Sequence, residues 1–384
     1  MSAEVALVTG GAGLIGSHLV DQLVQADWRV RILDNLEPVT HAESPPRLNP
    51  DAEFILGDVR DPTIVRRALA GVDVVFHQAA YGGYMPEVAK FIDVNVVGTA
   101  RILETIRSDS MSVRKVILAS SQAVYSEGAV TCEQHGLQFP PARALNLLEV
   151  GEFDVPCPLC GSIAQPSLTP ERAPAGGENV YAVSKYAAER LSLAWGVQSG
   201  IPVVPLRYSC TYGPRQSLGN PYTGVIAIFV TRILNGLPPL VFEDGRQTRD
   251  LGFVTDVARA NLVAAATDTW DGVPVNIGSG RATSVLELAN LLCAELDPSL
   301  QPVLTGEFRV GEIRGLTPDT SRAEAAHHFP RVRLREGLRA YLDWVGDQGS
   351  IGECFSSAAA RLRATGMLRR TDAATAPRRS STVG

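Results

Sequence analysis

The sequence has no long apolar run, few cysteines and no excess of basic charge, and each shortage excludes a class of protein. No stretch reaches the roughly 18 consecutive apolar residues of a transmembrane helix, so we expect no membrane span. The 384 residues carry 35 Lys and Arg against 41 Asp and Glu, and this acidic balance gives no electrostatic reason to bind nucleic acid. Six cysteines are too few for a disulfide scaffold, and the first residues lack the basic segment and cleavage site of a signal peptide. We therefore expect a cytoplasmic protein.

Short β-rich runs alternate with helical patterns in the first half of the chain. Strands are expected at 4–9, 29–34, 53–58, 72–80, 115–121 and 201–208, and helices near 14–26, 62–70, 93–107 and 179–195. Such alternation predicts an α/β fold whose parallel sheet has helices on both faces. Several of the strands are nearly continuous Val, Ile and Leu, as expected for strands buried on both sides.

A glycine-rich loop, GGAGLIG at 10–16, follows the first strand and opens the first helix. Glycines in this context let backbone amides and the helix N-terminus approach a pyrophosphate. A tight turn without a ligand is the alternative. Asp34 ends the second strand, where a carboxylate accepts hydrogen bonds from the adenosine ribose and repels a 2′-phosphate, which favours NAD over NADP. Asp58, after the third strand, is placed to meet the adenine amino group.

These features predict three regions. Residues 1–207 form a doubly wound Rossmann domain that binds NAD, and residues 126–178 are an insertion within it. Residues 208–346 form a smaller domain that mainly binds the substrate. Residues 347–384 are rich in Ala, Ser, Arg and Thr, which predicts a disordered tail.

A tyrosine and a lysine in YAVSK, Tyr181 and Lys185, lie four positions apart and so share a face of the predicted helix. A lysine ammonium and a positively charged nicotinamide ring beside a phenol lower its pKa, so Tyr181 is a candidate base near neutral pH. Ser121, at the end of a strand, is placed to hydrogen-bond the same substrate oxygen. Because a tyrosine and lysine at this spacing also occur on ordinary surface helices, the interpretation rests on the nucleotide loop upstream.

Motifs across residues 4–345 resemble the extended short-chain dehydrogenase/reductase family, in its nucleotide-sugar epimerase and dehydratase branch. The resemblance is carried by TGGAGLIG (9–16), LDN (33–35), GDVRD (57–61), HQAA (77–80), NVVGT (95–99), SSQAVY (120–125), YAVSK (181–185), LRYSCTYGPRQ (206–216), DGRQTRD (244–250) and DVARA (256–260). It implies a catalytic Ser121, Tyr181 and Lys185, bound NAD, and a nucleoside-diphosphate sugar as substrate. The cofactor contacts that it implies are Gly10, Gly13, Leu14, Ile15, Gly16, Asp34, Asn35, Asp58, Val59, Ala79, Ala80, Asn95, Tyr181 and Lys185.

The same resemblance separates the branches. Sugar 4,6-dehydratases of this family carry an Asp-Glu pair where this chain has Gln122 and Ala123, so dehydration is disfavoured and epimerisation at C4 is favoured. Cys210 stands where related epimerases usually have a substrate-contacting Asn, which puts the pose of the sugar or the diphosphate in doubt. The substrate contacts that the resemblance implies are Ser121, Gln122, Cys210, Arg215, Arg249 and Arg314.

Residues 126–178 interrupt the alternation, and they contain Cys132 and His135 (C-x2-H) followed by Cys157 and Cys160 (C-x2-C). Three thiolates and one imidazole are a usual tetrahedral zinc set, and four protein ligands make the zinc structural. Metal binding would also order a long loop that has little apolar content. Two alternatives stay open: unligated thiols, and a redox pair, which requires that the CxxC open a helix after a strand.

One subset of the branch, the dTDP-L-rhamnose 4-epimerase-like proteins, is similar in having a Cys-rich insertion with a CPxCG element and a run like residues 213–245. The resemblance therefore favours an NAD-dependent 4-epimerase acting on a dTDP-6-deoxyhexose such as dTDP-L-rhamnose. The alternatives are a UDP-glucose or UDP-glucuronate 4-epimerase and, from another class, a catalytically silent nucleotide-sugar-binding scaffold. Analogy with the family also implies a homodimer.

Overall fold

Seven parallel strands form the first sheet. Both faces of these strands carry apolar side chains, so the sheet lies in the interior of the protein with a core on each side. The computed structural model describes residues 3–41, 48–83, 85, 87–220, 222 and 224–372. Adjacent side chains such as Leu7 and Val8 enter opposite cores, as expected for a sheet covered on both sides. In spatial order the strands are β13 (Val275–Ile277), β9 (Val203–Tyr208), β5 (Lys115–Ser121), β4 (Val74–His77), β1 (Val5–Thr9), β2 (Arg29–Asp34) and β3 (Glu53–Leu56).

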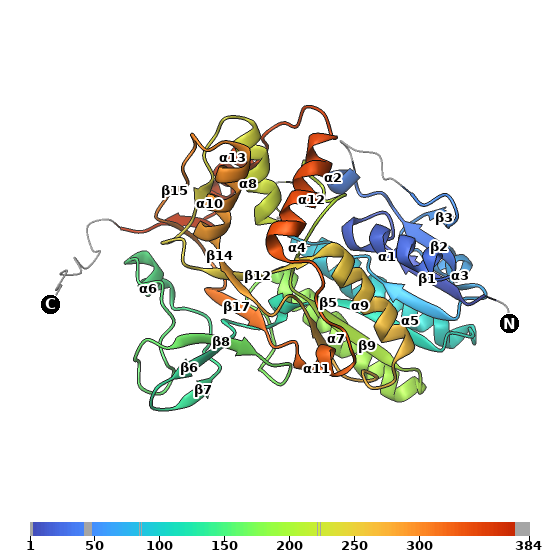
Figure 1. The fold of residues 1–384 in the computed structure, drawn as a ribbon. Helices are drawn as coiled ribbons and strands as arrows, with labels where there is room; N and C mark the ends of the chain where they lie inside the picture. Colours follow the sequence, from blue (N-terminus) through green and yellow to red (C-terminus); the bar gives the residue numbers. More distant parts are fainter. Residues whose placement is uncertain are drawn as a thin grey trace.

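Helices cover both faces of this sheet, so the predicted doubly wound α/β fold is confirmed (Figure 1). One face carries α1 (Leu14–Gln25) and α9 (Val254–Ala266), and the other carries α3 (Pro62–Leu69), α5 (Gly98–Ser108) and α7 (Val180–Ser199). The shorter elements of this half are α2 (Pro38–His41), α4 (Val88–Phe91), the π-helix η1 (Ile92–Val97) and the 3-10 turn η2 (Gln122–Val124).

The strand order reverses between β1 and β4. The chain winds from β1 through β2 to β3 and then returns to β4, from which it winds the other way through β5 and β9. In an open parallel sheet, ligands bind at the carboxyl ends of the strands on either side of such a reversal. The fold therefore directs the ends of β1 and β5 toward one crevice.

A second, mixed sheet lies beside the carboxyl ends of the first. Its strands are β10 (Cys210–Tyr212), β12 (Thr248–Phe253), β17 (Gly315–Pro318), β8 (Gln165–Thr169), β6 (Ala129–Cys132) and β7 (Gly136–Gln138), with β14 (Ala282–Ser284) also paired to β12. A separate core packs this part against α8 (Val225–Leu234), α10 (Val285–Leu296) and α12 (Leu334–Gly346). Throughout the described part of the chain, no helix is both long and apolar enough to span a bilayer.

The remaining elements are short. They are α6 (Leu145–Glu149), α11 (Ser321–Ala325), α13 (Phe355–Ala364), and the two-stranded ladders of β11 (Leu240–Val241) with β15 (Val303–Leu304) and of β16 (Glu307–Arg309) with β18 (Leu368–Arg370).

Two of the predicted boundaries need correction. Strand β13 and helix α9 lie beyond residue 207 and yet complete the first sheet and its helical cover, because the chain returns to that sheet after making β10. The predicted disorder of the tail is wrong for residues 347–372, which form α13 and β18. Their composition is polar, but Phe355, Leu362 and Leu368 find a small apolar core against α8 and β11. Residues 373–384 lie outside the described residues.

The insertion at 126–178 begins and ends next to the predicted catalytic residues. Ser126 donates a hydrogen bond from its hydroxyl to Glu178 at 2.6 Å, and Tyr125 and Ala175 form an antiparallel bridge. Between these ends the chain makes β6, β7, α6 and β8, and all three of these strands extend the second sheet. The insertion is therefore an arm of the second sheet whose base lies beside Ser121 and Tyr181.

Candidate active site

The glycine loop joins β1 to α1 so tightly that only glycine fits at its last position. A Cβ atom built on Gly16 would lie 2.1 Å from the carbonyl oxygen of Gly10. Gly10 has a φ of +67°, a conformation that L side chains rarely adopt. Gly13 caps α1 without any side-chain hydrogen bond to the first turn. The first amides of α1 thus stay available to an anion.

Two acidic side chains stand at the ends of the neighbouring strands. The Asp34 carboxylate accepts hydrogen bonds from the backbone amides of Ala12 (3.0 Å) and Leu36 (2.9 Å), which hold it at the edge of the loop. Asp58 accepts hydrogen bonds from Arg60 and from the Asn35 side chain. The hydrogen bond from Arg60 is the main reason that the pKa of Asp58 is lowered to about 2. Both carboxylates therefore offer fixed acceptors to a ligand.

A single cavity of about 630 Å³ runs from the glycine loop to the second sheet. Nearly all of the predicted cofactor contacts line it, although they come from four strand ends and two helices. These are Gly10, Gly13, Leu14, Ile15, Gly16, Asp34, Asn35, Asp58, Val59, Ala79, Ala80, Tyr181 and Lys185.

Asn95 is the one predicted cofactor contact that is not among the described residues lining the cavity. It lies in the π-helix η1, is buried, and its amide pairs with both backbone groups of Tyr81 (2.7 and 2.9 Å). The same amide donates to the Ser184 hydroxyl at 2.8 Å. Asn95 therefore acts on the site through its neighbours: it holds the loop after β4 against the helix that carries Tyr181 and Lys185.

Ser121, Tyr181 and Lys185 all face this cavity. Ser121 is the last residue of β5, and its hydroxyl also accepts a hydrogen bond from the Ala123 amide at 3.1 Å. Helix α7 begins after Asn179, whose side chain caps it by accepting from the Ala182 amide. This cap places Tyr181 in the first turn, beside the end of β5, with Lys185 one turn further on the same face.

The pKa of Tyr181 differs from the sequence-based expectation. Burial raises it, a hydrogen bond with Ser121 opposes that rise, and the neighbouring Cys210 thiol adds to it. Burial is the largest of these causes, so the Tyr181 pKa lies above its ordinary value in the protein by itself. Any activation depends on positive charge brought next to the phenol.

Burial lowers the pKa of Lys185 to about 8, and the negative charge of Glu189 opposes this shift. Glu189 lies one turn further along α7 and is itself buried. It accepts hydrogen bonds from Ser120 (2.6 Å) and from both sides of the Arg207 guanidinium (2.6 and 3.0 Å). This buried pair fixes a carboxylate behind Lys185 and helps to keep the ammonium charged.

The predicted substrate contacts divide into two groups. Ser121, Gln122, Cys210 and Arg249 line the cavity. Gln122 donates from its amide to the Cys210 sulfur at 3.3 Å, and its buried Oε1 has no hydrogen-bond partner among the described residues. Burial raises the pKa of the Cys210 thiol to about 11, so Cys210 faces the site as a neutral thiol. Arg249 pairs with Glu312, which also lines the cavity.

Arg215 and Arg314 are not among the described cavity-lining residues. Arg215 forms an ion pair with Asp21 at 2.7 Å. Arg314 is buried among carboxylates, with Glu243 at 3.0 Å, Asp244 at 2.6 Å and Asp154 at 3.0 Å. Acidic neighbours on other segments bind both arginines in this structure, and the substrate contacts that the resemblance implies for Arg215 and Arg314 stay predictions.

Several residues that line the cavity were not among the predicted site residues. Glu243 lines the cavity with a φ of +52°, and Phe242, Gln247 and Arg309 line it nearby. Phe355 reaches it from α13, inside the region predicted to be disordered. The aromatic and arginine side chains lie far apart in sequence and match no motif, so only their convergence in space identifies them.

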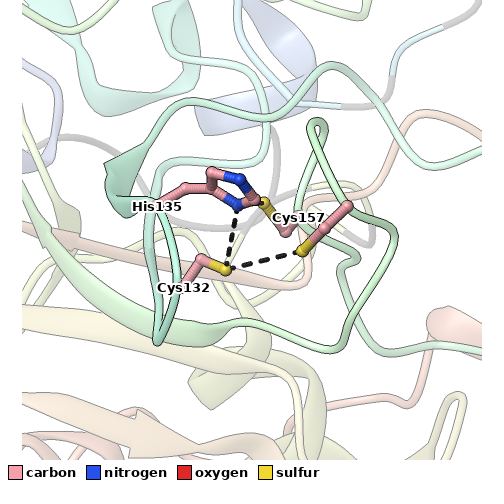
Figure 2. Close-up of side chains that lie close together, drawn as sticks. Cys132, His135 and Cys157 are labelled. Carbon is pink, nitrogen blue, oxygen red and sulfur yellow. Dashed lines mark hydrogen bonds between the residues drawn. The ribbon is translucent and has the colours of Figure 1, made fainter.

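The four predicted metal ligands do converge, as the sequence spacing predicts. The ligand atoms of Cys132, His135, Cys157 and Cys160 all lie within 4.8 Å of one another. His135 Nδ1 lies 3.6 Å from the sulfurs of both Cys132 and Cys157, and the sulfurs of Cys132 and Cys160 are 3.7 Å apart. Figure 2 shows Cys132, His135 and Cys157 pointing toward one another. These separations are close to the edges of a zinc tetrahedron, roughly 3.5–3.8 Å from the usual bond lengths.

The local backbone also distinguishes the alternatives for this cluster. Cys157 and Cys160 lie in a hairpin closed by the Pro156–Ile163 bridge, where the Gly161 amide donates to the Cys157 carbonyl at 2.9 Å. No helix starts at this CxxC, so the arrangement that a redox pair requires is not present. Neither Cys157 nor Cys160 forms a disulfide in this structure.

Comparison with known proteins places the chain in a family. The family model described as "NAD dependent epimerase/dehydratase family" matches residues 6–144 and 161–278. This chain belongs to that family. The resemblance to the extended short-chain dehydrogenase/reductases is thereby confirmed, and the match omits residues 145–160, which include Cys157 and Cys160.

Similar proteins span almost the whole chain. It is 33% identical to the dTDP-L-rhamnose 4-epimerase of Burkholderia thailandensis, over 89% of this chain and 95% of that protein. It is 35% identical to a putative UDP-glucose 4-epimerase of Methanocaldococcus jannaschii, over 88% of this chain and 97% of that protein. The solved UDP-glucose 4-epimerase of Thermotoga maritima with UDP-glucose has a TM-score of 0.72 and 28% identity, and the match covers 90% of this chain and 100% of that one.

The low pKa of Lys185 can be measured without any substrate. We expect Lys185 to be charged below about pH 8 and to lose its proton above it, because burial lowers its pKa to about 8. Reductive methylation as a function of pH, followed by mass spectrometry, should give a midpoint near pH 8 for Lys185, with the surface residue Lys90 as the internal reference.

Glu189→Gln should move this midpoint to lower pH, because it removes the negative charge that raises the Lys185 pKa. Ser120→Ala removes a hydrogen bond to Glu189 but keeps its charge, and it is the matched control. A Lys185 midpoint at the ordinary value of about 10.4, or an unchanged midpoint in Glu189→Gln, would contradict the assignment.

Proposed function

We propose that this protein is an NAD-dependent nucleotide-sugar 4-epimerase. The observation that carries the proposal is the placement of Ser121, Tyr181 and Lys185 on one cavity with the glycine loop and Asp34. The residues of the glycine loop fit a dinucleotide. The loop has no side chains in the way, and the first amides of α1, which no side chain caps, are free to bind a pyrophosphate. The Asp34 carboxylate is held at the edge of the loop, where it would accept hydrogen bonds from a ribose. Gln122 and Ala123 supply no acid–base pair for dehydration, which favours epimerisation.

In the proposed reaction Tyr181 accepts the proton of the sugar 4-hydroxyl, and the Ser121 hydroxyl binds the same oxygen. Lys185 stabilises the phenolate from the same face of α7, and Glu189 favours its charged form. When bound, oxidised NAD supplies hydride transfer at C4 and a positive charge beside the phenol. Tyr181 then returns the proton when the 4-keto sugar, turned over in the cavity, is reduced on its opposite face.

For the substrate we infer a dTDP-6-deoxyhexose such as dTDP-L-rhamnose. The Cys-rich insertion and the run at 213–245 support this choice, as does the 33% identical dTDP-L-rhamnose 4-epimerase. The 35% identical putative UDP-glucose 4-epimerase supports UDP-glucose as the second candidate, with UDP-glucuronate as a further one. The Gln122 and Cys210 pair lies in the cavity beside Ser121, so it is placed to distinguish between sugars at this position.

The activity is tested by incubating the protein with a panel of UDP-, dTDP- and GDP-sugars and identifying the products by NMR. Tyr181→Phe should lower kcat by about 100-fold or more, because proton transfer by a positioned side chain contributes about that much. Tyr186→Phe, on the same helix but away from the cavity, is the matched control. Unchanged turnover in Tyr181→Phe would refute the proposed role of Tyr181. If the parent protein turned over none of the nucleotide sugars, this would favour the scaffold alternative.

We further propose that Cys132, His135, Cys157 and Cys160 hold one structural zinc ion. The distances between the ligand atoms and the closed set of four support it. The local apolar core of the hairpin is small, consisting of Val130, Val155 and Ala164 besides two of the cysteines. Metal binding energy would then stabilise a fold that this core alone supports weakly.

The metal would act on the cavity through buried charges. Arg143, from the insertion, contacts Glu127 and Glu243 at 3.0 Å, and Glu243 lines the cavity. Asp154, next to the cysteine hairpin, pairs with Arg314, which also binds Glu243. Breaking a buried pair costs about 3–5 kcal/mol, so an ordered insertion holds this edge of the cavity in place.

Metal analysis of purified protein with reduced thiols should find about one zinc per chain. Cys157→Ser should lose the metal and lower the melting temperature, whereas Cys293→Ser, a buried cysteine outside the cluster, should keep the metal. Less than about 0.2 zinc per chain would count against the site.

A second copy of this chain is the proposed partner for an apolar surface on α4, η1 and α7. Val88, Ile92, Val183 and Leu191 are exposed there, and the elements pack together through Phe91 and Tyr181. Such a row of exposed apolar residues on adjacent helices is typical of an interface.

Sedimentation should therefore give a homodimer for the parent protein. Val183→Glu should shift the protein to monomer, because it places a charge in the interface, whereas Val197→Glu at the far end of α7 should not. A monomeric parent at micromolar concentration would contradict the proposal.

A further inference from the structure

His77 and Thr99 belong to two motifs that carry the family resemblance, HQAA (77–80) and NVVGT (95–99), but neither residue has a role in the proposed reaction. Both side chains are buried, each 2% exposed, and neither is among the described residues that line the cavity. His77 is the last residue of β4, and Thr99 lies at the start of α5. A buried imidazole needs a hydrogen-bond partner for each ring nitrogen, so the neighbours of His77 indicate its role.

The hydroxyl groups on either side of His77 determine which ring nitrogen carries the hydrogen. Thr99 donates its only hydroxyl hydrogen to the Asn95 carbonyl at 2.6 Å, so it accepts from His77 Nε2 at 2.9 Å. Burial lowers the pKa of His77 to about 3, and the positive charge of Lys185 adds to this shift. The ring is therefore neutral with its hydrogen on Nε2, and Nδ1 accepts from the Thr9 hydroxyl at 2.7 Å.

Thr9 connects the imidazole to the glycine loop. It is the last residue of β1, next to Gly10, and its buried hydroxyl accepts a hydrogen bond from the Ala79 amide at 3.2 Å. Ala79 lines the cavity, and a Cβ atom built on Gly10 would lie only 2.7 Å from its amide nitrogen. The chain of hydrogen bonds thus begins where the glycine loop meets the loop that follows β4.

Asn95 continues the chain from Thr99 to the helix that carries Tyr181. Its side-chain amide donates to the Ser184 hydroxyl at 2.8 Å, and Ser184 donates in turn to the Tyr181 carbonyl at 2.7 Å. The other amide hydrogen and the side-chain oxygen of Asn95 bind the backbone of Tyr81. Every hydrogen that these side chains can donate is therefore used, and a fully satisfied buried network is rigid.

We propose that His77 is a positioning residue for Tyr181. Its ring joins the two halves of a buried hydrogen-bond chain that runs from Thr9, beside the glycine loop, to the first turn of α7. The chain fixes the position of the proposed base relative to the glycine loop. The inference rests on the proposed function, in which hydride and proton leave one carbon and its oxygen, and a displacement of about 1 Å there costs up to about 100-fold in rate.

Thr99→Val tests the chain with little change in shape, because valine keeps the branched side chain and removes the hydroxyl. The His77 N–H and the Asn95 carbonyl lose their partner, so kcat should fall about tenfold while KM for the nucleotide sugar stays within about threefold. Thr99→Ser keeps the hydroxyl and should bring kcat back to within about threefold of the parent. Thr105→Val is the matched control on the same helix. The Thr105 hydroxyl donates to the Arg101 carbonyl at 2.8 Å, outside the chain, so kcat should stay within about twofold.

Thr9→Val interrupts the chain on the other side of His77 and should reproduce the effects of Thr99→Val. The His77 Nδ1 and the Ala79 amide then lose their partner, whereas α5 keeps its own sequence. Parent-like kcat in a folded Thr9→Val would overturn the proposal even if Thr99→Val did not fold.

Two further measurements need no substrate. In protein labelled with 15N-histidine, NMR should show His77 with its hydrogen on Nε2 both at about pH 5 and at about pH 8, because its pKa is lowered to about 3; His77→Gln identifies the signal. Hydrogen–deuterium exchange followed by mass spectrometry should show the amides of η1 and of the first turns of α7 exchanging about tenfold faster in Thr99→Val. Thr105→Val should leave this exchange at the rate of the parent.

The outcomes separate this proposal from the epimerase proposal. A lower kcat in Thr99→Val that Thr99→Ser recovers, with unchanged kcat in Thr105→Val, supports the role of His77. Parent-like kcat in a folded Thr99→Val, an equal loss in Thr105→Val, or a His77 hydrogen on Nδ1 would overturn it and leave the epimerase proposal standing. If the parent turned over no nucleotide sugar, the epimerase proposal would fail. Unchanged exchange in Thr99→Val would then overturn the positioning of α7 by the chain, and faster exchange would support it.

Discussion

The contact between Gly16 and the Gly10 carbonyl is the constraint on which the rest of the site depends. Because no Cβ fits there, α1 can begin directly against the turn that leaves β1. Its uncapped amides then face the crevice where the strand order reverses. Helix α1 packs on α9, which comes from the second half of the chain, and this contact holds the second sheet over the cavity. The glycine loop and the second sheet are thus linked through the contact between α1 and α9.

Buried charges hold the walls of this cavity at two further places. Glu189 and Arg207 form an ion pair behind Lys185, and Arg143 and Arg314 bind Glu243 at the edge of the second sheet. Isolated charges at such depth would be strongly unfavourable, so each is compensated by partners from another segment. These buried ion pairs make the cavity wall rigid at two places, next to Lys185 and next to Glu243. Segments as distant in sequence as the Cys-rich insertion and the loop at 242–247 become parts of the same wall.

Short motifs predicted the centre of the site well and its periphery poorly. Gly10, Asp34, Ser121, Tyr181 and Lys185 lie at strand ends or on one helix face, where spacing in sequence sets position in space. The convergence of Cys132, His135, Cys157 and Cys160 was also predictable, since the two residues of each pair are only three positions apart. The ligand contacts predicted for Arg314 and Asn95 stay predictions, because their side chains bind partners on other segments of the protein and neither residue lines the described cavity. Phe355 was missed because a polar composition hid a short helix whose few apolar residues find a core elsewhere.

The sequence by itself determined the order of strands and helices, the glycine loop, the Ser121, Tyr181 and Lys185 set, and the Cys132, His135, Cys157 and Cys160 cluster, because these depend on periodicity, on strand ends or on residues a few positions apart. Only the tertiary structure decided which arginines line the cavity, how burial shifts the pKa values of Tyr181 and Lys185, and that residues 347–372 fold into α13 and β18, with Phe355 in the cavity lining. Those properties arise from desolvation and from contacts between segments hundreds of residues apart. No local pattern records them.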